Sequence, residues 1–126
     1  MPNIVDTCGW LEYIAETKNS KNFEKVILDT ENLLVPPIVI YEVFKKICLE
    51  YCEDTALEVI AELKQGKVIE INETISIYAA RLSIEKKLPM ADALIYAIGL
   101  LYKATIYTQD NHFEGLSGVQ YFKKQK

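Results

Sequence analysis

The sequence predicts an α/β protein with a central parallel sheet of four to five strands, flanked by helices on both faces. Short apolar runs typical of strands alternate along the chain with segments whose apolar residues recur at helical spacing. Strands interleaved with helices favour a parallel sheet, because each parallel crossover needs a helix to return the chain. The chain has 126 residues, half of them hydrophobic and a quarter charged, and we expect 1–126 to form a single domain.

The N-terminal third is predicted to contain two strands and two helices. Residues 3–6 form the first predicted strand, and residues 7–17 form a helix whose apolar side chains recur one turn apart. A second helix is expected over 20–29, with Ser20 as its N-cap. The apolar run 33–35 is the second predicted strand.

Two prolines and a glycine mark the boundaries in the middle of the chain. Pro36 and Pro37 end the second strand and suit the first turn of a helix, which is predicted over 36–51. The next predicted helix, 53–65, is closed by a glycine. The third predicted strand is 68–71.

The C-terminal half is predicted to hold two helices and two strands. The helices are expected over 72–86, capped by a polar side chain, and over 89–103, opened by a proline. The strands are expected over 105–108 and, at an edge of the sheet, 119–122. A loop or helical turn at 111–116 connects them.

Four acidic residues fall where this topology reaches one edge of the sheet. Asp6 and Asp110 directly follow predicted strands, and the carboxyl ends of parallel strands share one edge. Asp92 lies in the first turn of a helix that runs antiparallel to the next strand, so that helix begins at the same edge. Glu42 lies about one and a half turns into the helix after the second strand, somewhat deeper. Carboxylates gathered there repel one another without a cation, and their oxygens suit Mg²⁺ or Mn²⁺.

Each acidic residue also has a purely structural interpretation. Asp6 and Asp110 would suit helix N-caps, and the helix dipole would favour Asp92 in a first turn. Glu42 could pair with a lysine three or four residues further on. However, three of the five aspartates in the chain fall at this one predicted edge, and that concentration favours a site.

The composition and the N-terminal sequence indicate which partners and which cellular compartment to expect. The net charge of −4 gives no overall attraction for nucleic acid, although lysine-rich segments could form a local basic patch or a solvated face. The N-terminus does not resemble a signal peptide, and no apolar segment has the roughly 20 residues of a membrane span. We expect a cytoplasmic protein without a membrane partner. Cys8, Cys48 and Cys52 are expected to be reduced, partly buried thiols rather than ligands of a soft metal.

Other classes with an acidic edge or a nucleotide loop fit the sequence poorly. A phosphoacceptor receiver domain needs an aspartate after the third strand, where this chain has Asn72. A haloacid-type phosphatase needs a second aspartate at Cys8, two residues after Asp6. Neither GxxxxGK nor GxGxxG occurs, which disfavours nucleotide-binding loops.

The acidic residues and their neighbours, in this order, resemble the PIN-domain nucleases, and most closely the VapC-type toxins of toxin–antitoxin pairs. The matching segments are 4–7, 40–43, 88–97 and 108–113. Together they span nearly the whole chain, and the last two are the more specific.

The resemblance implies a PIN-like three-layer sandwich and a divalent-metal-dependent endoribonuclease that cleaves RNA with metal-activated water. The implied catalytic and metal-binding residues are Asp6, Glu42, Asp92 and Asp110. Thr108 matches a hydroxyl residue that supports them by hydrogen bonding. The implied cofactor is Mg²⁺ or Mn²⁺, and the implied partners are an RNA substrate, a small antitoxin protein and a second copy of the chain in a homodimer.

Two points stay open at the level of sequence. The alternative function is a catalytically inactive PIN-like module that serves in binding or as a scaffold. His112, next to Asp110, could act as a general acid, but we expect it to be a packing residue of its loop.

Overall fold

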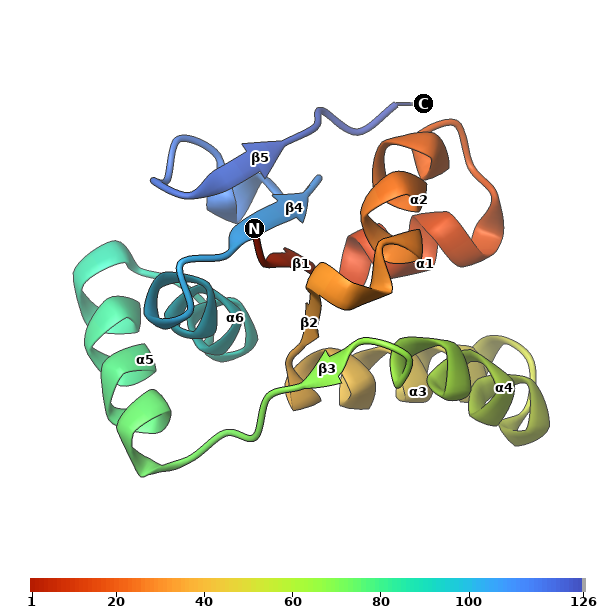
Figure 1. The fold of residues 1–126 in the computed structure, drawn as a ribbon, viewed down its shortest axis with the longest axis horizontal. Coiled ribbons are helices and arrows are strands. Elements are labelled where there is room, and N and C mark those ends of the chain that lie inside the picture. Colours follow the sequence, from red (N-terminus) through yellow and green to blue (C-terminus); the bar gives the residue numbers. More distant parts are fainter. Residues whose placement is uncertain (126) are drawn as a thin grey trace.

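The computed structural model describes residues 1–125, and within them five parallel strands form one sheet in the order β3-β2-β1-β4-β5 (Figure 1). The predicted α/β class and parallel sheet are therefore confirmed. The strands are β1 (Asn3–Val5), β2 (Leu33–Val35), β3 (Lys67–Val68), β4 (Thr105–Thr108) and β5 (Val119–Tyr121).

The helices cover both faces of the sheet and make it the middle of three layers. The pair α5 and α6 lies on one side, and α1 and α2 lie on the other (Figure 1). The α-helices are α1 (Thr7–Ala15), α2 (Ser20–Leu28), α3 (Pro37–Glu50), α4 (Glu53–Leu63), α5 (Glu73–Lys86) and α6 (Met90–Leu101). Two short 3-10 helices are η1 (Thr30–Asn32) and η2 (Asn111–Phe113).

Two local predictions differ from the structure. The strand predicted over 68–71 is only the two-residue β3, an exposed edge strand. The chain leaves the sheet after Ile69, whose backbone N–H donates to the carbonyl of Val35 at 3.1 Å. Ser20 is the first residue of α2 rather than its cap. Asn19 precedes it, and the Asn19 side chain instead donates to Gln109 Oε1 at 2.7 Å.

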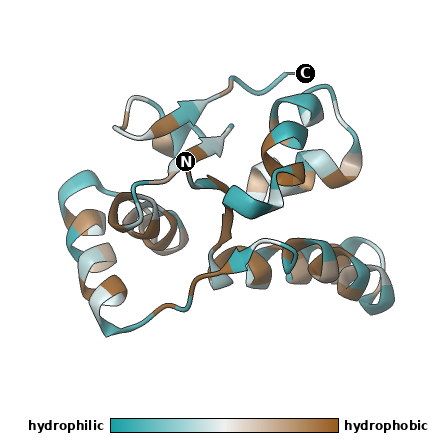
Figure 2. Cartoon of the chain, viewed as in Figure 1, coloured by the Kyte–Doolittle hydropathy of each residue, from teal (hydrophilic) through white to brown (hydrophobic). Residues whose placement is uncertain are grey.

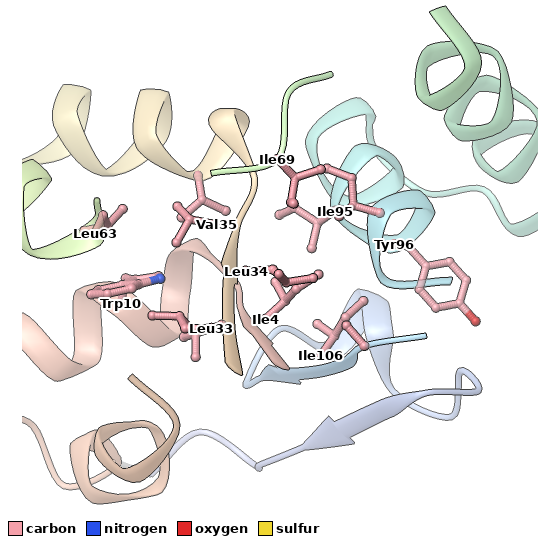
Figure 3. Close-up of a cluster of buried hydrophobic side chains, with 14 of the residues drawn as sticks. Ile4, Trp10, Leu33, Leu34, Val35, Leu63, Ile69, Ile95, Tyr96 and Ile106 are labelled. Atoms are coloured by element: carbon pink, nitrogen blue, oxygen red, sulfur yellow. The ribbon is translucent and has the colours of Figure 1, made fainter. Parts of the chain in front are cut away.

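Alternate residues of the central strands pack on opposite sides of the sheet. Leu33 and Val35 of β2 face Trp10, while Leu34 between them lies on the side of Ile95 (Figure 3). All five side chains are buried. Because both faces of a parallel sheet are covered, its strands appear in the sequence as continuous apolar runs.

Helix α6 is apolar around most of its circumference, because it lies between the sheet and α5 (Figure 2). Even so, none of the helices in residues 1–125 combines the length and the apolar character needed to cross a membrane. A close contact fixes how α6 lies on the sheet. A Cβ atom added to Gly99 would come within 2.6 Å of Ile106 Cδ1 of β4, so a larger residue there would require the Ile106 side chain to shift. This contact helps set where α6 begins and therefore where Asp92 lies.

Candidate active site

Asp6 is a buried carboxylate that links the first strand to the first helix. It follows β1 directly, and its Oδ1 accepts a hydrogen bond from the backbone N–H of Gly9 at 3.1 Å, which caps α1. The residue is only 3% exposed. A capping role alone does not require such burial, and burying a carboxylate costs free energy unless it is well compensated.

Thr108 joins two of the predicted acidic residues. It ends β4, which pairs with β1, and its side chain is fully buried. Its hydroxyl donates to Asp6 Oδ2 at 2.5 Å and accepts from the backbone N–H of Asp110 at 2.9 Å. One hydroxyl therefore fixes the Asp6 carboxylate and the start of the loop that carries Asp110.

Asp110 caps the short helix that follows β4. Its Oδ1 accepts from the backbone N–H of His112 at 2.9 Å. The side chain is 28% exposed, so the remaining oxygen positions are open to a ligand.

Asp92 lies near Asp110, although it comes from α6 rather than from the segment after β4. It lies in the first turn of α6, and its side chain is 15% exposed. Asp92 Oδ2 lies 3.0 Å from His112 Nδ1, and the same nitrogen lies 3.1 Å from Asp110 Oδ1. One ligand atom from each of these three residues lies within 4.8 Å of the others.

The interpretation of His112 as a packing residue is wrong. Its side chain is 52% exposed, and its ring nitrogen contacts two carboxylates instead of the apolar core. Phe113, the next residue, is the one that is buried, with its ring edge-on to Tyr96 at 6.3 Å. The sequence interpretation placed the apolar anchor of this loop one residue too early.

Glu42 lies beside the cluster rather than within it. Its Oε1 accepts from the hydroxyl of Thr7, the residue after Asp6, at 2.5 Å. It lines a shallow groove between α1 and α3 together with Lys45 and Lys46. Among the residues that the structure describes, the group spaced for a single ion contains Asp92, Asp110 and His112, and neither Asp6 nor Glu42 belongs to it.

Two residues that the sequence interpretation did not assign to the site contact its carboxylates. Cys8 Sγ donates to Asp6 Oδ1 and Oδ2 at 3.0 and 3.1 Å, and Thr7 holds Glu42 as described above. Cys8 lies two residues after the helix-capping Asp6, a position from which its side chain turns back toward the cap, whereas Thr7 reaches across to α3. Of the three thiols, Cys8 and Cys48 are partly buried as predicted, whereas Cys52 is exposed.

The electrostatics of the cluster favour protonation or a cation. Burial raises the pKa of the Asp6 carboxyl from its ordinary 3.8 to about 6, and the negative charge of Asp110 adds to this. Donors on Cys8, Thr108 and Gly9 act in the opposite direction. Burial, followed by the charge of Asp110, likewise raises the pKa of Asp92 to about 6, and His112 partly offsets the rise.

These raised pKa values predict that the metal-free protein loses stability as the pH rises. Between about pH 4 and pH 6 the folded protein binds more protons than the unfolded chain. The stabilisation that this proton binding provides is fully present below the unfolded pKa and is lost as the pH rises through the folded pKa. For the buried Asp6, the rise in pKa from 3.8 to about 6 corresponds to about 3 kcal/mol.

Urea denaturation in EDTA at several pH values between about 4 and 7 tests this expectation. The free energy of unfolding should fall across that range, and the Asp92→Asn variant should show a shallower fall. An equal slope in Asp92→Asn would contradict the charge coupling, and Asp54→Asn, an exposed aspartate on α4, is the matched control.

The donor set fits a hard divalent cation. Most of its ligand atoms are carboxylate oxygens, and they come from separate elements that the sheet holds in place. Within residues 1–125, no lysine or arginine forms an ion pair with Asp6, Asp92 or Asp110. Burial and then the charge of Asp110 raise the Asp92 pKa, and a divalent ion bound by both carboxylates would offset the repulsion between them.

Solved structures of known fold resemble this chain over almost its full length. A chain of a toxin–antitoxin complex from Klebsiella pneumoniae superposes with a TM-score of 0.79 at 21% identity, covering 94% of this chain and 95% of that one. A chain of VapBC2 from Rickettsia felis, bound to a promoter DNA fragment, gives a TM-score of 0.74 at 15% identity, with 97% and 98% covered. A chain of DNA-bound VapBC from Salmonella typhimurium gives the same values.

The chain matches a family model, but no individual curated protein sequence. No curated protein sequence matches the chain significantly. The family model described as the PIN domain matches residues 4–119, a span that contains all the acidic residues discussed above. This match, over more than half of the chain, shows that the chain belongs to the PIN domain family.

Proposed function

We propose that residues 1–126 act as a single PIN domain with divalent-metal-dependent endoribonuclease activity, as the toxin of a toxin–antitoxin pair. The observation that carries this proposal is the meeting of Asp6, Asp92 and Asp110 at the carboxyl edge of the sheet, in a chain of this family. Mg²⁺ or Mn²⁺ is the proposed cofactor.

In this proposal Asp92 and Asp110 hold the cation, and Asp6 and Glu42 contribute directly or through water. When bound, the cation would make water a better nucleophile near neutral pH and offset charge that builds up on the phosphate. Thr108 keeps the Asp6 carboxylate and the Asp110 backbone in fixed relation, so the ligands need little rearrangement to bind.

The basic side chains near the site are suited to the RNA backbone. Lys45 and Lys46 line the groove that Glu42 borders, and Lys124 lines a second groove with Asp110. Phosphate contacts from lysine supply affinity without reading sequence. They compensate locally for the net charge of −4.

We propose two protein partners on the basis of the similar structures. The K. pneumoniae, R. felis and S. typhimurium structures are of toxin–antitoxin or VapBC complexes, which supports a small antitoxin protein as the inhibitor of this chain. A homodimer and a cytoplasmic site of action complete the proposal.

Metal removal provides the sharpest biochemical test of cofactor dependence. Cleavage is expected to stop in excess EDTA and to return when Mn²⁺ or Mg²⁺ is added beyond the chelator, because the carboxylate cluster is proposed to work only with a cation. Cleavage that resists EDTA would contradict the proposed mechanism.

The function itself is tested on a labelled total RNA pool with the purified protein, in Mn²⁺, in EDTA, and with the Asp92→Asn variant alongside. Cleavage that needs both the metal and Asp92 is expected, and fragment ends would identify the target. Folded protein that binds RNA but cleaves none of it under any condition would favour the alternative, a catalytically inactive binding or scaffold module.

A further inference from the structure

His112 is the one histidine in the sequence, and its ring lies beside Asp92 and Asp110. Two local contacts hold it there. Its backbone N–H donates to Asp110 Oδ1 at 2.9 Å, which fixes the start of η2. The next side chain, Phe113, is fully buried against Tyr96 of α6, the helix that also carries Asp92. The ring is therefore anchored relative to both acidic residues.

The separations around the ring nitrogen match those of ligands on one ion. Nδ1 lies 3.0 Å from Asp92 Oδ2 and 3.1 Å from Asp110 Oδ1. Metal–ligand bonds of about 2.1 Å at right angles place neighbouring ligand atoms about 3 Å apart. Small side-chain rotations would therefore let one ion bind between the nitrogen and the two oxygens.

A nitrogen ligand changes which cation the site prefers. Mg²⁺ favours oxygen ligands and gives up its waters reluctantly, whereas imidazole nitrogen binds first-row transition ions more strongly. Most of the cluster consists of carboxylates, which accept either kind of ion, so the nitrogen is the group that can distinguish them.

We propose that His112 Nδ1 is a direct ligand of the cation at this site, together with Asp92 and Asp110, and that it makes the site select Mn²⁺ or Co²⁺ over Mg²⁺. The inference rests on the metal-binding part of the proposed function but not on RNA cleavage. It assigns His112 a role in metal choice rather than in proton transfer to the leaving group.

The test measures cation affinity without RNA, at about pH 8, where a free imidazole is neutral. Mn²⁺ binding is followed by the electron paramagnetic resonance signal of the free ion, and Mg²⁺ binding by calorimetry. The variants are His112→Ala, His112→Gln, which keeps a polar side chain of similar length, and Asn111→Ala, an exposed neighbour on the same short helix as the control. Circular dichroism shows whether each variant is folded.

Both His112 variants are expected to weaken Mn²⁺ binding by about tenfold or more, while Mg²⁺ binding stays nearly unchanged. Co²⁺ should report the same loss through a change in its visible absorption, because water or an amide oxygen replaces a nitrogen ligand. Asn111→Ala should bind all three ions as the wild type does.

Two results would overturn the inference, and they are distinguishable from failure of the proposed function. If the wild type binds these cations and folded His112 variants bind Mn²⁺ equally well, or lose Mg²⁺ to the same extent, His112 does not select the metal. If the wild type binds none of the cations, the metal-binding part of the proposed function fails as well. Unchanged affinities combined with slower RNA cleavage would assign His112 to proton transfer instead.

Discussion

The Asp92→Asn variant is expected to lose RNA cleavage and, in EDTA, to be more stable than the wild type. The substitution keeps the size of the side chain but removes one negative charge from a cluster in which burial and Asp110 already raise the Asp92 pKa to about 6. It also removes a proposed metal ligand. Even residues that only support metal ligands contribute about 10- to 100-fold, so cleavage should fall by more than about a hundredfold.

Two measurements on the same preparation separate these effects. Cleavage of the labelled RNA pool in Mn²⁺ measures the loss of activity, and thermal unfolding in EDTA measures the gain in stability. Asp54→Asn makes the same change in net charge at an exposed position in the first turn of α4, and should retain cleavage without gaining stability. Full cleavage by Asp92→Asn would contradict the metal-dependent mechanism, whereas lost cleavage together with lower stability would indicate a structural defect.

The Thr108→Val variant is expected to be destabilised by about 2 to 4 kcal/mol, a large fraction of the stability of a small domain. Valine has nearly the same shape but no hydroxyl. The buried Asp6 Oδ2 would lose its 2.5 Å donor and keep only the weaker thiol donor of Cys8 at 3.1 Å, and the backbone N–H of Asp110 would lose its side-chain acceptor at 2.9 Å. Leaving buried polar groups without partners costs more than the net gain from one hydrogen bond.

Thr108→Ser is the matched control, because serine keeps the hydroxyl and loses only a methyl group. Urea denaturation of both variants in EDTA gives the comparison, and Thr108→Ser should lie much closer to the wild type. RNA cleavage should also fall in Thr108→Val, since the Asp6 carboxylate and the Asp110 segment would no longer be held together. Equal stability of the two variants would show that the methyl group, rather than the hydroxyl, contributes the stability at Thr108.

The strands and helices were predictable because their signals are local. Prolines at 36, 37 and 89, and the apolar runs at β1, β2 and β4, mark boundaries that neighbouring residues determine. β3 was predicted too long, because the residues after it are apolar for a different reason. Ile69 is buried where the chain leaves the sheet edge, and this burial depends on contacts with other elements.

The site also has features that sequence order predicts and features that depend on packing between elements. That Asp6, Asp92 and Asp110 reach one edge follows from sequence order alone, because parallel strands share a carboxyl edge and a helix leading into a strand must start there. Where their side chains point does not follow from order. The seating of α6 on β4 through Gly99, and the burial of Phe113, bring Asp92 and Asp110 to the same histidine nitrogen.

Sequence patterns were therefore sufficient to predict the fold class, the element boundaries to within a few residues, and the sheet edge at which three aspartates lie. Three features became visible only in the folded chain: His112 contacts two carboxylates, Glu42 bonds to Thr7 outside that group, and one Thr108 hydroxyl connects Asp6 to Asp110. The difference arises from how far apart in the chain the interacting residues are. Hydrophobic periodicity and capping act between residues close in the chain, whereas each of these arrangements includes at least one contact between residues 20 or more positions apart.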